Sequence, residues 1–449
     1  MRSDRVKVLH PLLGKPMLSY PLDAALTALR PERTVVVVGY QGAEVQTAFS
    51  DPTITFVQQH EQLGTGHAVS ATDPVLSTLD GTILILCGDI PLITAQTIRS
   101  MVNAHWKQGA TLTVLTASLE DPSGYGRVVR SPAGEVQKVV EEKDATERER
   151  GIAEVNSGIY CVEAGFLFQA LAEVRSDNVQ GEYYLPDIVE TAYNQKRPVW
   201  GYGASDPLEI MGINTRADLA RAEEVLSARV KQHWMLEGVT IHNPASVYIE
   251  SDVRIGKDTV IHPTCHLRGT TSIGDQCHIG PHVEIVDSAI GNRVTVRFCT
   301  VISEATIEDG ATVGPFAHLR PLTHLEKDVR IGNFVEIKKS RVRQGTKANH
   351  LSYIGDAEVG ERVNIGAGTI TCNYDGQQKH QTIVEDDVFV GSNTALVAPI
   401  RIGHESVVGA GSTVTKDVPP HALVVTRGKQ KHIPDWTKKR GTKTKKDPE

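Results

Sequence analysis

The sequence predicts two architectures in one chain of 449 residues, an α/β half followed by a parallel β-helix. Short apolar runs separated by helix-like stretches occupy the first 210 residues. After residue 240, aliphatic residues recur at every sixth position. Between the halves, residues 215–234 lack proline and are rich in Ala, Glu, Arg and Leu, which predicts a connecting helix. We therefore place the boundary near residue 230.

The α/β half is predicted from three buried-strand candidates and an intervening helix. The apolar runs 34–38, 82–86 and 111–116 have the length and β-branched content of strands, and residues 94–108 read as a helix. Strands that alternate with helices favour a sheet covered by helices. We expect a Rossmann-like mixed sheet, with mainly parallel strands, in residues 1–214.

The six-residue period predicts the β-helix. The recurring aliphatics run in register, with one-residue phase shifts between series: Ile249, Ile255, Ile261, Leu267, Ile273, Ile279, Ile285; Ile290, Val296, Ile302; Ile307, Val313, Leu319; Val384, Val390, Leu396, Ile402, Val408, Val414. One inward aliphatic per six residues fits one short strand and one turn, and three such repeats make a triangular coil. Coils of about 18 residues would stack at the strand spacing of about 4.8 Å. A β-sandwich would not keep a phase of six.

Composition limits the partners. The chain has 47 basic and 54 acidic residues, a net charge of −7, and only 5% aromatic residues. A polyanion would meet net repulsion, and aromatic platforms for base stacking are scarce. We expect no nucleic-acid partner, whereas small phosphorylated substrates remain open.

Cysteine usage and hydropathy indicate the compartment. The six cysteines form no C-x-x-C pair, which suits a reducing environment better than a disulfide framework or a cysteine-based zinc site. No apolar run approaches the roughly 18 residues needed to span a bilayer, and the first residues lack a signal-type segment. We expect a cytoplasmic protein that is not bound to a membrane.

Polar and glycine-rich segments punctuate the α/β half. Ligands of open α/β sheets bind at the carboxyl ends of strands. Asp89 follows the apolar run ILILCG, so its carboxylate is predicted to enter that crevice and hold Mg²⁺ against a nucleotide phosphate. The other segments are VKVLHPLLGKP around Lys7, QHEQLGTG from Gln59, GYGR from Gly124, EEK from Glu141, NSG from Asn156 and GIN ending at Asn214.

Together these segments resemble the sugar-nucleotidyltransferase family. The resemblance implies in-line attack of a sugar-1-phosphate oxygen on the α-phosphorus of UTP, with Mg²⁺ and lysine neutralising charge. It implies that Lys7 neutralises phosphate charge and that Asp89 and Asn214 ligate Mg²⁺. The uracil is expected to contact Gln59, Gly64 and Thr65, and the N-acetylglucosamine (GlcNAc) moiety to contact Gly126, Glu141 and Asn156.

One departure from the family concerns the start of the sequence. In the family, a first strand and a glycine-rich turn ending in arginine precede the position of Met1, and they cradle the UTP phosphates. Val6 also stands where the family pattern usually has proline. We therefore expect weak uridylyl transfer from the chain as given. We hypothesise a start codon assigned too late, which an intact mass of the native protein matching Met1 would refute.

The six-residue rhythm is interrupted between residues 320 and 382, and interruptions of a repeat mark loops or sites. Acetyl transfer to a sugar amine needs a base near neutral pH, and neutral histidine provides one. His350 is the candidate base. A carboxylate such as Glu336 could orient its imidazole, and Asn373 could stabilise the oxyanion.

The repeats resemble the hexapeptide-repeat family, whose members form left-handed parallel β-helices that commonly trimerise. With the first half, the chain resembles the family of bifunctional GlcNAc-1-phosphate uridylyltransferases and glucosamine-1-phosphate N-acetyltransferases. By this resemblance His350 is the base and Glu336 its partner. The sugar phosphate is expected to contact Arg320, Lys338, Tyr353, Asn364 and Lys379, and acetyl-CoA to contact Asn373, Tyr374, Ser392, Ala410 and Arg427.

Two alternatives stay open. The histidine pairs His262/His266 and His278/His282 could belong to a metal hydratase of the hexapeptide type, in which histidines from neighbouring subunits bind zinc. Positions four apart on a β-helix, however, generally fall on different sides of a turn. The second alternative is a nucleotidyltransferase whose β-helix serves only for assembly, which predicts no acetyl-CoA turnover.

These resemblances imply a homotrimeric enzyme of UDP-GlcNAc synthesis that supplies peptidoglycan and other cell-wall or amino-sugar polymers. It acetylates glucosamine-1-phosphate with acetyl-CoA, and then joins GlcNAc-1-phosphate to UTP. We expect the nucleotidyltransferase domain in residues 1–214, a connecting helix in 215–234, the acetyltransferase β-helix in 235–425, and a basic, mobile tail in 426–449.

Overall fold

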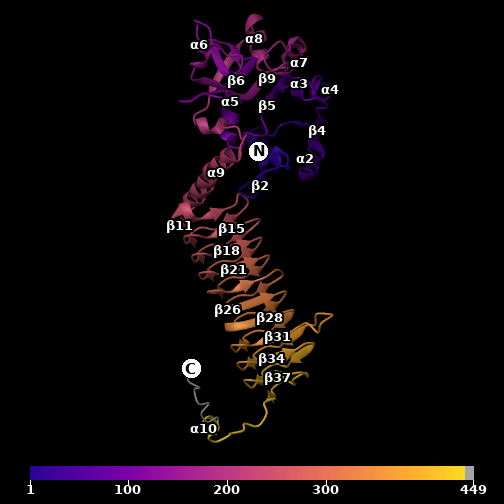
Figure 1. The fold of residues 1–449 in the computed structure, drawn as a ribbon, viewed down its shortest axis with the longest axis vertical. Helices are drawn as coiled ribbons and strands as arrows, with labels where there is room; N and C mark the ends of the chain where they lie inside the picture. Colours follow the sequence, from indigo (N-terminus) through magenta and orange to yellow (C-terminus); the bar gives the residue numbers. More distant parts are fainter. Residues whose placement is uncertain (440–449) are drawn as a thin grey trace, which may run out of the picture. The chain divides into compact units, whose positions relative to one another are not determined.

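The computed structural model describes residues 1–439 and separates into two compact units, the second of which begins at Val230 (Figure 1). The finer domain bounds given above stay predictions. The last ten residues of the predicted tail lie outside the described part. Within that part, no helix is both long enough and apolar enough to cross a bilayer.

A six-stranded mixed sheet forms the centre of the first unit. Its order is β10 (Val199–Gly203), β6 (Leu112–Ser118), β9 (Glu154–Glu163), β7 (Arg127–Arg130) and β8 (Val136–Val140), and β5 (Thr82–Ile85) also pairs with β9. The mixed sheet is as predicted, but the mainly parallel arrangement is wrong here. Only β10 and β6 are parallel, because the ten-residue β9 runs antiparallel to β5, β6 and β7.

Two smaller sheets accompany it. Strands β3 (Thr34–Val38) and β4 (Ile54–Gln58) form a parallel pair, so the predicted strand 34–38 lies outside the six-stranded sheet. Strands β1 (Pro11–Leu12) and β2 (Lys15–Pro16) form a short antiparallel pair.

Helices cover both faces of the central sheet. Successive residues of a strand point to opposite sides, so each face has apolar side chains that pack against its own helices. On one face, Val114 and Tyr160 pack in a core cluster with residues of α7 (Ala164–Glu173) and α8 (Asp187–Asn194). On the other, Leu115 and Cys161 pack with residues of α1 (Ser19–Leu29) and α5 (Ala95–Lys107). The remaining helices are η1 (Lys7–Leu9), α2 (Gly42–Ala48), α3 (Thr65–Ser70), α4 (Asp73–Leu76), α6 (Glu147–Arg150), η2 (Pro207–Ile210) and α9 (Arg216–Leu236).

Two predicted helices are confirmed with their approximate bounds. Helix α5 begins after Thr94, whose side chain accepts a hydrogen bond from the Thr97 backbone N–H. Helix α9 corresponds to the predicted connecting helix and runs for 21 residues.

The second unit is a left-handed parallel β-helix whose short strands stack coil on coil in three faces (Figure 1). Face one contains β11 (Thr240–Ile241), β14 (Val260–Ile261), β17 (His278–Ile279), β20 (Thr295–Val296), β23 (Thr312–Val313), β26 (Arg330–Lys338), β28 (Lys347–Gly355), β30 (Asn364–Ile365), β33 (Phe389–Val390), β36 (Val407–Val408) and β38 (Leu423–Val424). Face two contains β12 (Tyr248–Ile249), β15 (His266–Arg268), β18 (Glu284–Val286), β21 (Val301–Ser303), β24 (His318–Leu319), the second halves of β26 and β28, β31 (Ile370–Cys372), β34 (Ala395–Val397) and β37 (Thr413–Val414).

Face three contains β13 (Arg254–Ile255), β16 (Ser272–Ile273), β19 (Ala289–Ile290), β22 (Thr306–Ile307), β25 (His324–Leu325), β27 (Arg341–Val342), β29 (Ala357–Val359), β32 (Thr382–Val384) and β35 (Ile400–Ile402). The 3-10 helix η3 (Pro244–Ser246) lies in the first coil, and α10 (Trp436–Lys439) follows the last. All described strand pairs of this unit are parallel apart from an isolated antiparallel bridge between Tyr374 and Lys379.

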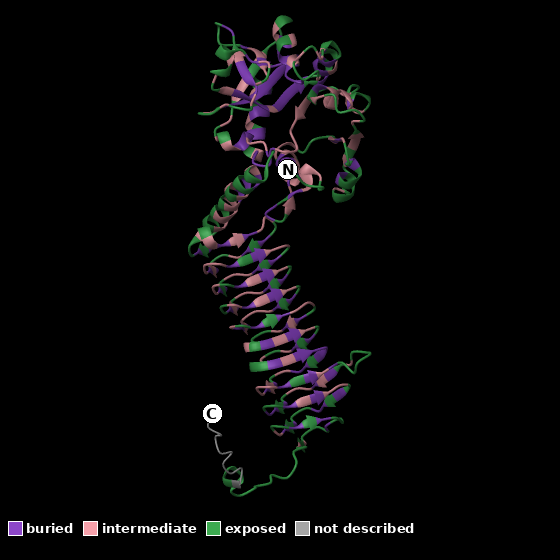
Figure 2. Ribbon diagram, in the orientation of Figure 1, coloured by how far each residue is buried: buried purple, intermediate pink, exposed green. Residues whose placement is uncertain are grey.

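The six-residue aliphatics are the core of the β-helix. Ile249, Ile279 and Val390 have no exposed surface and belong to one continuous cluster along its interior (Figure 2). The predicted interruption also exists in the structure. There, β26 and β28 are nine residues long each and run continuously around the corner between faces one and two.

Candidate active sites

Three predicted residues of the first unit meet at one point. The Lys7 Nζ lies 2.6 Å from Asp89 Oδ2 and 2.7 Å from Asn214 Oδ1, although the partners are 82 and 207 positions away in the sequence. A carboxylate and an amide oxygen thus converge on one cationic group. Oxygen donors of this kind are the ligands that hard divalent cations prefer, so the donor set fits a divalent metal.

Backbone contacts hold these side chains. Lys7 begins η1, and Asp89 stands in the loop that follows β5. The Ile213 N–H donates to the Asp89 carbonyl at 2.9 Å, which ties the Asn214 segment to that loop. The Asp218 carboxylate accepts hydrogen bonds from the backbone N–H groups of Asn214 and Thr215 and fixes the start of α9.

A second predicted group lies around Gln59. Its Nε2 donates to the Gly64 carbonyl at 3.2 Å and lies 3.1 Å from Nδ1 of His67. A carbonyl can only accept, so the amide nitrogen must face Gly64. Gln59 Oε1 therefore remains available as an acceptor for a ligand N–H.

The loop 182–185 holds the glycine-rich turn in place. Tyr183 accepts a hydrogen bond from Gly66 at 2.8 Å, and the Thr65 hydroxyl accepts one from Leu185 at 3.0 Å. Gly64 has φ = 108°, and a Cβ there would lie 2.7 Å from the Tyr183 carbonyl oxygen. Only glycine fits this left-handed position against the loop backbone.

The third predicted group, Gly126, Glu141 and Asn156, is also brought together. The Asn156 N–H donates to the Gly126 carbonyl at 2.8 Å, and a Cβ on Gly126 would lie 3.3 Å from Glu141 Oε1. Burial, followed by the charges of Asp144, Asp187 and Glu182, raises the pKa of Glu141. A partly buried carboxylate among other acids favours a partner that donates hydrogen bonds, as a sugar hydroxyl does.

In the β-helix, the exposed imidazole of His350 stands at the corner inside β28, and its Nδ1 lies 3.1 Å from Asn333 Oδ1 of β26. Glu336 does not contact this imidazole in the structure, because its carboxylate accepts a hydrogen bond from the Arg320 guanidinium at 2.8 Å. The register explains this, because Asn333 faces His350 whereas Glu336 faces Tyr353. Asn333 is thus the neighbour of the imidazole, and a role for Glu336 as its partner stays a prediction.

The predicted sugar-phosphate residues form a basic cluster in part. Lys338 lies close to the positive groups of Lys379 and Arg320, and the proximity of Lys379, followed by burial, lowers the pKa of Lys338. Close positive charges of this kind favour binding of a phosphate dianion. The buried carboxylate of Asp356 anchors the cluster, since it lies 4.0 Å from Lys338 Nζ and 2.6 Å from Asn373 Nδ2.

Two further predicted residues occupy neighbouring positions. Tyr353 joins the cluster, since its hydroxyl lies 3.4 Å from Asn373 Nδ2. Tyr374 begins an exposed loop and donates its hydroxyl proton to the Gly376 carbonyl at 2.7 Å. Asn364 lies on a different face from Tyr353. In the strand ladder, Asn364 is opposite Lys347 and Phe389 on face one, whereas Tyr353 lies on face two.

The remaining predicted acetyl-CoA residues share the corner that carries His350. Backbone hydrogen bonds link this corner from coil to coil, from Gly368 to Leu351, from Asn393 to Ala367 and from Gly411 to Ser392, at 2.6–2.8 Å. Ala410 precedes Gly411, and Arg427 lies within 3.8 Å of the Cβ position of that glycine. Ser392, Ala410 and Arg427 therefore follow one another along the corner that carries His350.

Comparisons with known proteins agree with both halves. The Nucleotidyl transferase family matches residues 2–206, the Bacterial transferase hexapeptide (six repeats) family residues 252–287, and the Hexapeptide repeat of succinyl-transferase residues 381–416. The "Bifunctional protein GlmU" of Geotalea uraniireducens is 49% identical over 441 residues, which is 98% of this chain and 96% of that protein. The chain belongs to the GlmU family.

Other relatives have the same name. The "Bifunctional protein GlmU" of Trichlorobacter lovleyi is 49% identical and that of Shouchella clausii 46%, each over 98% of this chain and 96% of the relative. GlmU membership makes the chain a bifunctional transferase, with a nucleotidyltransferase and an acetyltransferase activity and a divalent-metal dependence of the first.

Some residues of this GlmU family chain were missed at the sequence level. Asn333 could have been found by counting, because it lies 17 positions, or one coil, before His350. His67 and Asp218 had no such signal, since their contacts with Gln59 and Asn214 depend on how the loops close.

The zinc alternative draws its histidines from neighbouring subunits and stays a prediction. Within one chain, the only group of three or more potential His, Cys, Asp or Glu ligands that lie close together in residues 1–439 is His404, Glu405 and His421. None of the four histidines considered for zinc belongs to it.

Proposed function

We propose that the β-helix acetylates glucosamine-1-phosphate with acetyl-CoA and that the α/β unit then joins GlcNAc-1-phosphate to UTP. The order follows from the chemistry, because the product of acetyl transfer is the sugar substrate of uridylyl transfer. The observation that carries the proposal is the exposed His350 imidazole beside Asn333, at the corner where Ser392, Ala410 and Arg427 follow in successive coils.

In the acetyl transfer, the sugar amine attacks the thioester carbonyl carbon while His350 accepts the amine proton. The C–N bond forms, the C–S bond breaks, and the thiolate of CoA leaves and takes up a proton. Asn333 Oδ1 can accept a hydrogen bond from Nδ1–H of His350, which leaves Nε2 unprotonated as the base. The basic cluster around Lys338 is suited to holding the sugar phosphate. Nδ2 of Asn373 already donates to Asp356 at 2.6 Å and lies 3.4 Å from the Tyr353 hydroxyl, so a role of Asn373 at the oxyanion stays a prediction.

In the uridylyl transfer, an oxygen of GlcNAc-1-phosphate attacks the α-phosphorus of UTP and pyrophosphate leaves. Asp89 and Asn214 would hold Mg²⁺, which when bound supplies Lewis-acid charge neutralisation at the phosphates. Lys7 adds a positive charge at the same point, and Gly126, Glu141 and Asn156 orient the sugar.

The orientation of Gln59 supports a preference for uracil. Uracil N3 carries a hydrogen, which Oε1 of Gln59 can accept, whereas cytosine N3 is itself an acceptor. His67 contributes as a positioning residue because its unprotonated Nδ1 accepts the second amide hydrogen.

A homotrimer is supported by an aromatic ridge on the His350 corner. Phe298, Phe316 and Phe334 are 40%, 42% and 56% exposed. The Phe298 and Phe316 rings meet edge to face with centroids 4.7 Å apart, and the Phe316 and Phe334 rings stack with centroids 5.3 Å apart. The exposed Leu351 continues the ridge beside His350. A second copy of the chain that covers the ridge would bury apolar surface and close the acetyl site at once. We place the assembly in the cytoplasm, because its cysteines are free and suit a reducing compartment.

Two assays on the purified chain test the proposal. Acetyl-CoA with glucosamine-1-phosphate should release the thiol of CoA, and UTP with Mg²⁺ and GlcNAc-1-phosphate should release pyrophosphate. Uridylyl transfer without any release of CoA would favour the β-helix as an assembly module only. Sedimentation of the wild type and of Phe316→Glu should give three times the chain mass for the first and a smaller species for the second.

A further inference from the structure

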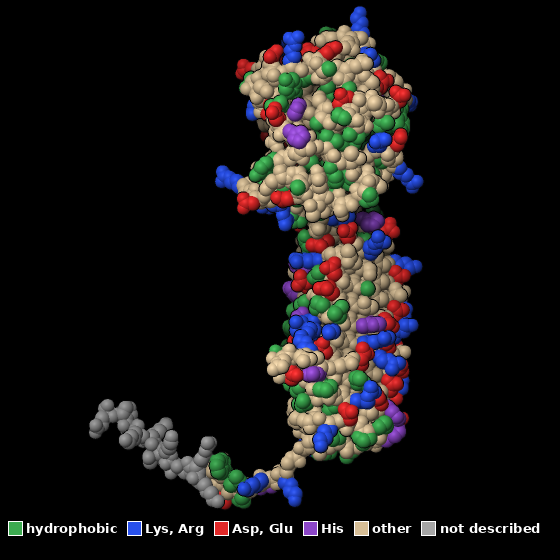
Figure 3. All heavy atoms as spheres, turned by 90° about the vertical axis from the view of Figure 1, so that its right-hand side faces the viewer, with side chains coloured by type: hydrophobic (Ala, Val, Ile, Leu, Met, Phe, Trp, Pro, Cys, Tyr) green, Lys and Arg blue, Asp and Glu red, His purple; other side chains and the backbone are tan. Residues whose placement is uncertain are grey.

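A cluster of two histidines and a glutamate lies outside both sites, on the last coils of the β-helix. His404 and Glu405 follow β35 at the turn toward β36, and His421 precedes β38 at the same corner one coil later. The His421 N–H donates to the His404 carbonyl at 2.9 Å, so the two turns are stacked directly. Histidine side chains gather near this end of the β-helix in Figure 3.

The side chains converge on one another. Nδ1 of His421 lies 3.3 Å from one carboxylate oxygen of Glu405, and Nδ1 of His404 lies 4.0 Å from the other. The imidazoles meet edge to face with centroids 4.7 Å apart, and one ligand atom from each residue lies within 4.8 Å of the others. In a tetrahedral site with bonds of about 2.0–2.1 Å, ligand atoms are about 3.4 Å apart. Small rotations of the three exposed side chains reach that spacing.

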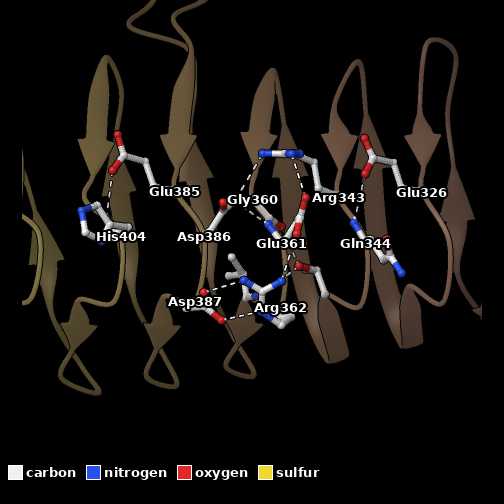
Figure 4. A network of polar contacts seen from close by, with 12 residues as sticks. Glu326, Arg343, Gln344, Gly360, Glu361, Arg362, Glu385, Asp386, Asp387 and His404 are labelled. Atoms are coloured by element: carbon white, nitrogen blue, oxygen red, sulfur yellow. Dashed lines mark hydrogen bonds and ion pairs between the residues drawn. The ribbon is translucent and has the colours of Figure 1, made fainter.

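The charges around the cluster favour a cation. Figure 4 shows the neighbouring acids already engaged, Asp386 with Arg343 and Asp387 with Arg362. Glu385 pairs with Arg401 and also accepts from the His404 backbone N–H at 2.9 Å, which holds the turn. Within residues 1–439, Glu405 makes ion pairs only with His404 and His421. Unlike Asp386, Asp387 and Glu385, the carboxylate of Glu405 thus has no arginine partner in the part of the chain that the structure describes.

We propose that His404, Glu405 and His421 bind a transition-metal ion of the zinc class, which links the last coil of the β-helix to the preceding coil. Two imidazole nitrogens and one carboxylate oxygen are a donor set for Zn²⁺, Co²⁺ or Ni²⁺, whereas Mg²⁺ and Ca²⁺ prefer oxygen alone. Stacked parallel strands fix the backbone spacing of the ligands, so little ordering is needed on binding. The last coil has a neighbour on one side only, and this coil gains most from such a link.

The test uses the full chain without a histidine tag, freed of metal with a chelator and kept in excess Mg²⁺ to occupy the nucleotidyltransferase metal site. Zn²⁺ binding is measured by calorimetry, and Co²⁺ binding by its visible spectrum. We expect one equivalent per chain. His404→Ala and His421→Ala should each weaken binding at least tenfold, and Glu405→Gln should weaken it several-fold.

A matched control is available on the same β-helix. His242 and His262 are also stacked from coil to coil, with ring centroids 5.2 Å apart, but no third ligand joins them in the described residues. His262→Ala should bind Zn²⁺ like the wild type. Equal binding by His404→Ala and the wild type, or absence of stoichiometric binding by the wild type, would overturn the proposal.

A second readout tests the link itself. Zn²⁺ should slow amide hydrogen exchange at the last coil in the wild type, and should have no such effect in His421→Ala. Acetyl and uridylyl transfer by all three variants, measured in parallel, report whether the fold is retained. Protection by Zn²⁺ that persists in His421→Ala would contradict the link.

Discussion

The two active sites are assembled in different ways. In the α/β unit, Lys7, Asp89 and Asn214 come from loops separated by up to 207 positions. In the β-helix, Asn333 and His350 are one coil apart, and Ser392 and Ala410 continue along the same corner. A site on a repeat is set by register, whereas a site on loops is set by the closure of the whole unit.

This difference has a consequence for variants. A substitution in the β-helix site leaves the parallel ladder intact, because the ladder is made of backbone hydrogen bonds and the inward aliphatics. A substitution in the loop site removes a contact that also holds distant segments together. The following substitutions test the two units independently, and they are ordered from the largest expected effect to the smallest.

His350→Ala should lower kcat for acetyl transfer by about 10²–10⁴, because the amine loses its base. Uridylyl transfer should be unchanged, as measured by pyrophosphate release on the same preparation. His324→Ala, which replaces another β-helix histidine, is the control. Acetyl transfer at the wild-type rate would exclude His350 as the base.

Asp89→Asn is the corresponding test of the uridylyl-transfer site. It should lower uridylyl transfer by about 10²–10³, because one carboxylate ligand and its charge are lost. A chelator should abolish the same activity in the wild type and leave acetyl transfer intact. If Asp89→Asn kept its full Mg²⁺-dependent rate, Asp89 would not be the metal ligand.

Asn333→Ala tests which residue orients the imidazole. We expect a loss of about tenfold in kcat for acetyl transfer, and partial recovery in Asn333→Asp, since either side chain can accept from Nδ1–H. Glu336→Gln, on the same strand β26, is the matched variant. A larger loss in Glu336→Gln with an altered pH profile would assign the orienting role to Glu336 instead.

His67→Ala should narrow the preference for UTP over CTP by about tenfold, because the Gln59 amide loses one of the two acceptors that fix it. The change should appear in the ratio of kcat/KM for the two nucleotides. His67→Asn, whose oxygen can still accept, should restore part of the preference. An equal loss for both nucleotides would indicate a general structural effect.

The smallest effect concerns the stability of the α/β unit. Burial, followed by the charges of Glu190 and Asp144, raises the pKa of Asp187 from 3.8 to about 6. A raised carboxyl pKa destabilises the folded state progressively as pH rises from 3.8 through 6, and the full cost is present above pH 6. Asp187→Asn should therefore raise the free energy of unfolding at pH 7.5 by about 1 kcal/mol, after allowance for solvent screening of the partly exposed side chain.

The gain from Asp187→Asn should shrink as pH falls toward 4. Urea denaturation at several pH values measures it, and Asp80→Asn on the surface is the control. A gain that is independent of pH would show that the charge of Asp187 is not its cause.

The β-helix could be predicted almost completely, because one inward aliphatic such as Ile279 marks each strand and the phase of six marks each turn. In the α/β unit, the helix 95–107 was predictable from its pattern and its Thr94 cap. The antiparallel course of β9 was not, since pairing with β5 and β6 depends on long-range contacts. Likewise, Asp89 was predicted to follow a strand, but the strand before Gln59 and the contact of His67 with Gln59 had no such signal.

The three-faced coil also sets a rule for length. Each coil returns the chain to the same corner, so an insertion of one whole coil between β21 and β23 would elongate the β-helix and keep His350 beside Asn333. An insertion of six residues inside the coil that separates Asn333 from His350 would turn everything after it by one face and carry the imidazole away from its amide. Insertions and deletions in the β-helix therefore preserve the acetyltransferase site only when they comprise whole coils.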